Sequence, residues 1–347
     1  MFATSNRNPR LRPVHRTGLA LIALLLVLPA GAQTAHREVL KRMGSRFELT
    51  AVGATEAQCA AAVRAGFAEI ERIERLISSW DPQSQTSAIN RAAGRQPVRV
   101  DPELYDLIHR AKKVSALTEG AFDISYASMD RIWHFDGSMD ALPDSATVRA
   151  ARAHIDWQRI ELNPDSSTVF LRDHGMKIGF GAIGKGYAAN RARACMRALP
   201  GVTGGVVNAG GDLITWGTST RPEGWTVHIT DPKDPSATVG WLRVDDLAVV
   251  TSGDYERFVE FDGVRYAHII DPRTGYPTTG IKSVTLVCPD AELADALATS
   301  VFVLGVERGL ALVNRLRYVE CLVVTDADEL RPSEGMRLNR ERLGGAR

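Results

Sequence analysis

A polar cluster stands at the end of an apolar run, where residues 266–277 read Tyr-Ala-His-Ile-Ile-Asp-Pro-Arg-Thr-Gly-Tyr-Pro. The run predicts a strand that enters a turn, because Pro272 presets its own φ and Gly275 readily takes a positive φ. Such a turn would hold four polar side chains close together: His268, Asp271, Arg273 and Thr274. An imidazole, a carboxylate and a guanidinium suit the handling of a phosphate group or a metal ion. The alternative is a hairpin whose polar residues are merely solvated.

A second candidate is the glycine-rich run from Gly179 to Gly186, which opens a helical pattern extending to about Leu199. Its four glycines allow a ligand to approach the backbone closely, and amide groups at a helix N-terminus favour phosphate. Lys185 would add a positive charge. The spacing differs from the P-loop pattern, and a structural turn between a strand and a helix is the alternative.

Asp295 and Thr299 lie four residues apart in the helical pattern from Asp290 to Val303, so both side chains share one helix face. A carboxylate and a hydroxyl arranged in this way offer two oxygen ligands to Mg²⁺. The alternative is an aspartate that stabilises the first turns of its helix and a threonine that bonds to its own backbone.

Other elements must position these residues. Apolar spacing and start signals predict a helix after Thr55 and another after Asp101, with Pro102 at its first position. Asp81 to Asn90 is predicted to be a polar loop. Strands are predicted at residues 39–52 (interrupted at 43–45), 158–162, 168–171, 176–180, 206–214, 225–230, 239–244, 248–251, 258–261, 264–270, 283–287 and 321–324. Within 206–214, the glycines indicate that something passes close to the strand's backbone.

The first residues predict an export signal. Four arginines precede an unbroken apolar run from Leu19 to Leu28, and Ala30-Gly31-Ala32 supplies a small-residue cleavage pattern. The run is shorter than the about 20 residues that a transmembrane helix needs. We therefore expect a signal peptide at residues 1–32 and a periplasmic or otherwise exported mature protein without an integral membrane span. An uncleaved leader that holds the chain at the inner membrane is the alternative.

Removing the leader changes the charge balance. It carries four of the 42 basic residues and none of the 41 acidic ones, so the remaining 315 residues have a net charge of −3. A slightly acidic chain lacks the positive field of a general nucleic-acid binder, and we expect no nucleic acid as a partner. The four cysteines have long, irregular spacings that suggest neither a disulfide framework nor a zinc site.

Taken together, these pieces resemble the exported FAD:protein FMN transferase family, also called ApbE-like. The resemblance covers nearly all of the mature chain and consists of eight motifs in order: Met43-Gly44-Ser45, Trp80-Asp81-Pro82, Gly120-Ala121-Phe122-Asp123, residues 181–187, Gly210-Gly211-Asp212, Thr251-Ser252-Gly253, residues 268–275 and residues 294–299. It implies an α+β fold related to the tunnelling fold, with a mixed sheet, helices and two lobes that hold the flavin between them. The family domain would span residues 33–332, and a basic tail would follow at 333–347.

The resemblance also implies an activity. Members of the family use Mg²⁺ to cleave the pyrophosphate of FAD and attach FMN, through a phosphoester, to a threonine or serine of an acceptor protein. This chain shows no fused acceptor domain, so the acceptor would be a separate flavoprotein subunit of a membrane or exported redox system.

By resemblance, the FAD contacts are Met43, Trp80, Ala121, Phe122, Asp123, Lys185 and Ile270. The Mg²⁺ ligands are Asp295, Thr299 and the backbone carbonyl of Ala182. His268 and Asp271 lie beside this centre as candidates for proton transfer or orientation. An unperturbed imidazole, with a pKa near 6.5, is a reasonable general base, but which of the two residues handles the proton stays open.

Two positions depart from the family pattern. Gly179-Phe180 stands where the family usually has an Asp-Leu pair, which leaves a side-chain contact to FAD at this point unassigned. Ser45 replaces the usual threonine and keeps its hydroxyl. Two other functions stay open: an FAD pyrophosphatase that releases FMN and AMP, and a non-catalytic flavin-binding protein.

Overall fold

The computed structural model describes residues 33–129, 132–135, 138–254 and 258–340. The predicted signal peptide lies outside these residues, as do residues 341–347 of the predicted tail. Among the helices that are described, none has both the length and the apolar character needed to cross a membrane.

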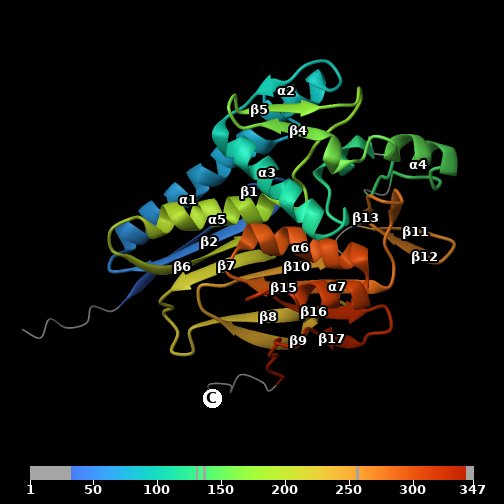
Figure 1. Cartoon of the computed structure of the whole chain (residues 1–347). Helices are drawn as coiled ribbons and strands as arrows, with labels where there is room; N and C mark the ends of the chain where they lie inside the picture. Colours follow the sequence, from blue (N-terminus) through green and yellow to red (C-terminus); the bar gives the residue numbers. More distant parts are fainter. Residues whose placement is uncertain (1–32, 130–131, 136–137, 255–257, 341–347) are drawn as a thin grey trace, which may run out of the picture. The chain divides into compact units, whose positions relative to one another are not determined.

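An eight-stranded sheet forms the base of the fold, and every neighbouring pair of strands in it is antiparallel (Figure 1). Its order is β1 (Thr34–Arg42), β2 (Ser45–Gly53), β6 (Val202–Ala209), β7 (Asp212–Gly217), β10 (Ala248–Gly253), β15 (Ile281–Cys288), β16 (Glu320–Thr325) and β17 (Leu330–Pro332). Together with the helices that pack on it, this sheet gives the expected α+β fold.

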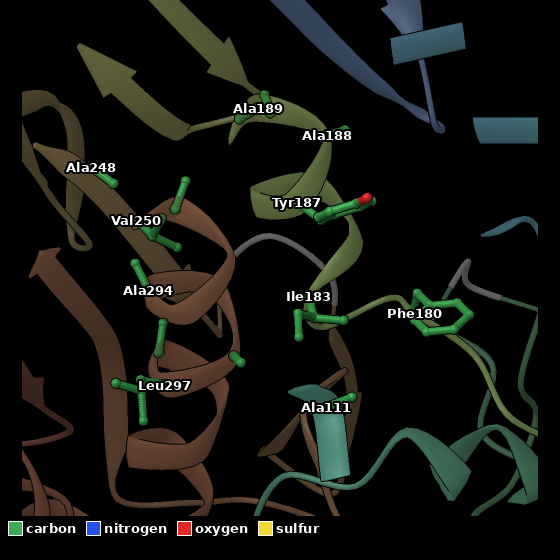
Figure 2. Packing of buried hydrophobic residues seen from close by; sticks show 14 of the residues in the cluster. Ala111, Phe180, Ile183, Tyr187, Ala188, Ala189, Ala248, Val250, Ala294 and Leu297 are labelled. Atoms are coloured by element: carbon green, nitrogen blue, oxygen red, sulfur yellow. The ribbon is translucent and has the colours of Figure 1, made fainter. Parts of the chain in front are cut away.

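Helices cover one face of the sheet: α1 (Glu56–Ile77), α5 (Gly184–Arg197), α6 (Ala291–Leu304) and α7 (Val306–Val313) (Figure 1). Figure 2 shows the tight layer between them, where Ala248 and Val250 of β10 lie beside Ala294 and Leu297 of α6. All four side chains are buried. Small residues at such positions let a helix approach the sheet closely, which fixes the placement of α6.

The opposite face is covered in part by the hairpin of β8 (Trp225–Asp231) and β9 (Asp234–Val244). A separate apolar cluster joins Ile229 and Leu242 of the hairpin to Val249 and Leu322 of the sheet. Val249 stands between Ala248 and Val250, which face the helices, so β10 has the period of two that a strand buried on both faces requires.

The remaining elements lie beyond the helical layer and around its end. They are α2 (Gln85–Ala92), a small sheet of β3 (Val98–Arg99), β5 (Thr168–Leu171) and β4 (Ile160–Asn163), α3 (Pro102–Leu117), α4 (Ser145–Arg152), the 3-10 turns at Ile124–Met129 and Trp157–Arg159, and two hairpins, β11 (Phe258–Phe261) with β12 (Val264–Ala267) and β13 (Ile270–Asp271) with β14 (Tyr276–Pro277).

Helix starts agree with the sequence. Thr55 accepts a hydrogen bond from the Gln58 amide at the start of α1, and Asp101 accepts one from the Glu103 amide at the start of α3. The four cysteines are all free thiols, and Cys59, Cys288 and Cys321 are buried.

Two predicted elements are wrong. Residues 176–180 are not a strand. The Asn90 side chain, and not a neighbouring strand, makes the backbone hydrogen bonds of Ile178: it accepts from the Ile178 amide at 2.8 Å and donates to the Ile178 carbonyl at 3.0 Å. Residues 81–90 are not only a loop: Ser84 accepts a hydrogen bond from the Ser87 amide and starts α2.

Two predicted strands are divided in the structure. The glycines of 206–214 form the turn between β6 and β7, with φ of +70° at Gly210 and +107° at Gly211. The predicted close approach is also present at Gly210, where an added Cβ would lie 3.0 Å from the Cβ of Ser45. The predicted strand 264–270 bends at His268, and its two halves join different hairpins. The predicted strand 248–251 extends to Gly253 as β10.

An ionic network joins the helices. Arg72 of α1 donates to Glu69 at 2.8 Å and to Glu103 of α3 at 2.6 and 2.8 Å, while Arg191 of α5 donates to Glu69 at 3.0 Å. Tyr187, also of α5, donates to Glu103. The Arg72 guanidinium holds the pKa of Glu69 and of Glu103 below its usual value.

We expect Arg72→Gln to lower the free energy of unfolding by about 1–2 kcal/mol at pH 7, since it removes charge-assisted hydrogen bonds at a partly exposed site. Carboxylates with a lowered pKa stabilise the fold above their ordinary value of 4.5, and this contribution is lost as the pH falls through the lowered pKa. The difference between wild type and variant, measured by urea denaturation, should therefore shrink in acid. Arg75→Gln, at an exposed pair with Glu71, is the matched control, and an equal loss there would contradict the prediction.

Candidate active site

Residues from distant parts of the chain line a cavity of about 690 Å³. Its lining comes from the β1–β2 turn, the end of α1, residues 121–126, the glycine-rich run, the end of β10, residues 268–272 and α6. Of the residues that the sequence singled out for flavin, metal or proton handling, eleven line this cavity: Met43, Trp80, Ala121, Phe122, Asp123, Ala182, Lys185, His268, Ile270, Asp295 and Thr299. Asp271 is absent from the lining.

Met43 lies in the two-residue turn between β1 and β2. Its φ is +48° and that of Gly44 is +72°, the left-handed pair that a tight hairpin turn requires. The Met43 amide donates to a carboxylate oxygen of Glu74, at 2.8 Å, so α1 holds this turn at the edge of the cavity.

Trp80 lies in the loop that follows α1. Ser78 ends the helix and its hydroxyl accepts a hydrogen bond from the Trp80 amide, at 3.2 Å. Trp80 is 70% exposed although it lines the cavity. Its side chain therefore lies at the mouth of the cavity and is not packed into the apolar core.

Asp123 organises the segment that carries Ala121 and Phe122. Its buried carboxylate accepts hydrogen bonds from the Ser125 amide at 2.8 Å, the Ser125 hydroxyl at 2.6 Å and the Trp157 amide at 2.9 Å. Burial raises the pKa of Asp123. Through these hydrogen bonds the Asp123 carboxylate stabilises the loop that carries Ala121 and Phe122.

The glycine-rich run brings α5 and α6 together. Ile183 gives α5 no side-chain cap; instead, the Asp295 carboxylate of α6 accepts a hydrogen bond from the Gly186 amide, at 3.0 Å. A Cβ on Gly186 would overlap the Ala291 carbonyl and lie 2.9 Å from the Cβ of Asp295. Only glycine allows this approach. Gly179, Gly181 and Gly184 have the spacing of a dinucleotide-binding turn, but that turn belongs to parallel βαβ units, and the sheet here is antiparallel.

Lys185 forms an ion pair with Asp212, which is buried just after the β6–β7 turn. Burial raises the pKa of Asp212, and the ammonium group of Lys185 opposes that shift. The pair fixes the lysine side chain where the first turn of α5 meets the cavity.

Asp295 and Thr299 line the cavity together with Ala182, as their spacing in α6 predicts. Asp295 is 4% exposed. A carboxylate, a hydroxyl and a backbone carbonyl are the hard oxygen donors that suit Mg²⁺. The part of the chain that the structure describes contains no cluster of three or more His, Cys, Asp or Glu side chains suited to a metal, so this set with a single carboxylate is the candidate that the site offers.

His268 and Asp271 have different surroundings. The bend between β12 and β13 turns His268 into the cavity lining, where its ring meets Phe135 edge to face at 6.4 Å. The Asp271 carboxylate accepts hydrogen bonds from the Arg273 side chain at 2.9 and 2.8 Å. Arg273 also donates to the Val303 carbonyl at the end of α6, at 3.2 Å. Asp271 therefore stabilises the turn and joins it to α6.

Glu74 and Tyr126 are among the lining residues that no sequence motif indicated. Glu74 belongs to a helical face rich in charged residues, and nothing in its spacing distinguishes it. Tyr126 follows the Gly120–Asp123 motif closely, but only the fold brings its hydroxyl to the glycine-rich run.

The motifs of this cavity also identify the family. A model of the ApbE family matches residues 43–323, which include every residue of the cavity lining. The chain belongs to the ApbE family. A protein of Klebsiella pneumoniae named FAD:protein FMN transferase is 36% identical over 78% of this chain and 84% of its own length. A protein of Treponema pallidum with the same name is 34% identical over 84% of each chain. The crystal structure of an ApbE protein from Thermotoga maritima, 30% identical, superposes with a TM-score of 0.79 over 87% of this chain and 97% of that one.

Within this ApbE fold, we expect Gly186→Ala to destabilise the protein by about 1–3 kcal/mol, because the added methyl group forces α5 and α6 apart. Thermal unfolding of the purified variant measures the loss. Ala194→Gly, at an exposed position of α5, should cost at most about 1 kcal/mol through helix propensity alone. If Gly186→Ala were as stable as wild type, Gly186 of α5 would not be packed against Ala291 of α6.

Proposed function

We propose that this protein is an FAD:protein FMN transferase that uses Mg²⁺ to cleave FAD and attaches FMN, through a phosphoester, to a threonine or serine of an acceptor flavoprotein. One observation carries the proposal: the residues assigned by resemblance to flavin, metal and proton handling, apart from Asp271, line a single cavity. Its volume, about 690 Å³, is within the range of sites for cofactor-sized ligands.

The cavity lining combines apolar and charged groups, which supports a flavin nucleotide as substrate. Met43, Trp80 and Ile270 offer apolar surface to a flavin ring, whereas Lys185 and the amides that open α5 suit a pyrophosphate. The Lys185 ammonium group, held by Asp212, would meet the phosphate as a fixed charge.

The metal proposal depends on Asp295, Thr299 and the carbonyl of Ala182. A bound Mg²⁺ would neutralise the negative charge that develops on the phosphoryl oxygens. The Asp295 carboxylate, which accepts a hydrogen bond from the Gly186 amide, would also be the charged ligand of the cation.

For the proton of the acceptor hydroxyl, we propose His268 as the general base. It lines the cavity, and an imidazole is the side chain most often used as a general base. Asp271, whose carboxylate binds the Arg273 guanidinium, would instead orient the turn that carries His268.

The expected export by residues 1–32 would bring the enzyme to its acceptor outside the cytoplasm. A flavoprotein subunit of an exported or membrane-bound redox system, with its hydroxyl residue in an accessible segment, is the partner that this activity requires.

The function itself is tested by incubating the protein with FAD, Mg²⁺ and a candidate acceptor domain. Fluorescent FMN that stays on the acceptor through denaturing electrophoresis is the expected result, and an acceptor with its threonine changed to alanine is the control. Free FMN with AMP would instead indicate a pyrophosphatase, and unchanged FAD would indicate a flavin-binding protein. Either of these outcomes contradicts the proposal.

We expect His268→Ala to lower the transfer rate by about 10²–10⁴-fold at saturating Mg²⁺, the usual contribution of a general base. Binding of FAD, followed by flavin fluorescence, should change little. His228→Ala, at an exposed position of the β8–β9 hairpin, is the control and should transfer at the wild-type rate. If His268→Ala keeps that rate too, the base must be another group.

We expect that Mg²⁺ no longer stimulates transfer in Asp295→Asn. The asparagine side chain still offers an oxygen to the Gly186 backbone amide, but it lacks the charge that holds a divalent cation. The readout is the transfer rate against Mg²⁺ concentration, with the melting temperature as a check on folding. A variant that folds and still responds to Mg²⁺ like wild type would remove Asp295 from the ligand set.

A further inference from the structure

Backbone hydrogen bonds fix the bend that carries His268. The strand β12 ends at Ala267, and β13 begins at Ile270. Between them, the Ile269 carbonyl accepts hydrogen bonds from the Thr278 amide at 2.9 Å and from the Thr278 hydroxyl at 3.1 Å. These bonds hold the main chain of the bend, but they do not set the side-chain torsions that orient the imidazole ring.

Phe135 contacts the imidazole of His268 and is not itself part of the cavity lining. The ring centroids lie 6.4 Å apart, with an interplanar angle of 76°. Aromatic pairs favour such edge-to-face arrangements at centroid distances of about 4.5–7 Å. Phe135 is half-buried. Its side chain therefore acts on the candidate site through the ring that it contacts.

Trp133 holds Phe135 and joins it to both sides of the bend. The buried indole ring is nearly parallel to the Phe135 ring, with 6.4 Å between the centroids and 12° between the planes. It also lies 6.3 Å from the ring of Tyr266 in β12 and 6.0 Å from the ring of Tyr276 in β14. Its N–H donates to the Gly275 carbonyl at 2.9 Å. One buried side chain thus connects the strand before the bend, the turn after it and Phe135.

The orientation of the imidazole matters for proton transfer. A general base must direct a lone pair at the proton that it removes, within hydrogen-bond distance of the donor oxygen. A small misplacement of a reacting group lowers the rate strongly. A neighbouring ring that limits the rotation of the imidazole therefore increases the fraction of molecules in which the base is ready to react.

We propose that Phe135 is a positioning residue: its ring, held by Trp133, limits the rotation of the His268 imidazole, so that a ring nitrogen stays directed at the acceptor hydroxyl. The inference rests on the proposed function, since it takes His268 as the general base.

The kcat and KM of the transfer reaction test the role. Phe135→Leu removes the aromatic ring and keeps an apolar side chain. We expect kcat at saturating acceptor and Mg²⁺ to fall by about three- to tenfold, in line with the contribution of one aromatic pair. The KM for FAD should stay close to that of wild type, because Phe135 does not line the cavity. Phe135→Tyr keeps the ring and should keep kcat close to wild type. Phe170→Leu, at a half-buried position of β5, is the matched control and should leave both constants unchanged.

Nuclear magnetic resonance tests the contact without turnover. The ring current of Phe135 shifts the resonances of the carbon-bound imidazole protons of His268, which are identified by their loss in His268→Ala. At a fixed pH and without FAD, we expect Phe135→Leu to move these resonances and Phe170→Leu to leave them in place. If the melting temperature shows that Phe135→Leu does not fold, Phe135→Met takes its place, since it also lacks a ring and is judged by the same measurements.

The results separate this inference from the proposed function. If His268→Ala is slow while Phe135→Leu keeps the wild-type kcat, Phe135 has no positioning role and the base stands. A higher KM for FAD with an unchanged kcat would assign Phe135 to substrate binding and overturn the inference. Imidazole resonances that stay in place in Phe135→Leu would show that the two rings are not in contact. If His268→Ala transfers at the wild-type rate, the proposed base fails, and the role of Phe135 fails with it.

Discussion

The close approach of α5 to α6 is the constraint on which the candidate site depends. Gly186 lets the two helices meet, and its amide gives Asp295 a hydrogen bond. The same contact fixes the first turn of α5, which carries Lys185, and the face of α6 that carries Thr299. A buried carboxylate needs hydrogen-bond partners, so the helix start and the candidate metal ligand stabilise each other.

Local patterns in the sequence indicated which side chains share a helix face or a turn, but not which segments meet in space. Asp295 and Thr299 could be paired from spacing alone, because one helix face is a local property. The turn at 271–275 was also readable, and Gly275 has the positive φ that was expected. Which motifs share a cavity could not be derived from local patterns, since that depends on sheet order. The resemblance to a family supplied it, and the structure brings the assigned residues together except Asp271.

The errors have a common physical cause, which is that backbone hydrogen bonds can be satisfied in more than one way. Residues 176–180 look like a strand, but the Asn90 side chain replaces a neighbouring strand. The predicted strand 206–214 is interrupted by the turn at Gly210 and Gly211. Tyr126 was missed for another reason: its hydroxyl lies against Gly181, 55 positions away, and no pattern of residue types indicates such a contact.

The exposure of Trp80 has an energetic consequence for the molecule without its substrate. A ring that is 70% exposed at the mouth of the cavity is hydrated on a face that a planar aromatic compound can cover. Removing about 80 Å² of apolar surface from water is worth roughly 2 kcal/mol. A flat, apolar partner would release this free energy most fully, because it covers the most of the ring's area at once. The exposed ring therefore stores binding energy at the mouth of the cavity, apart from any interaction with the charged groups of the lining.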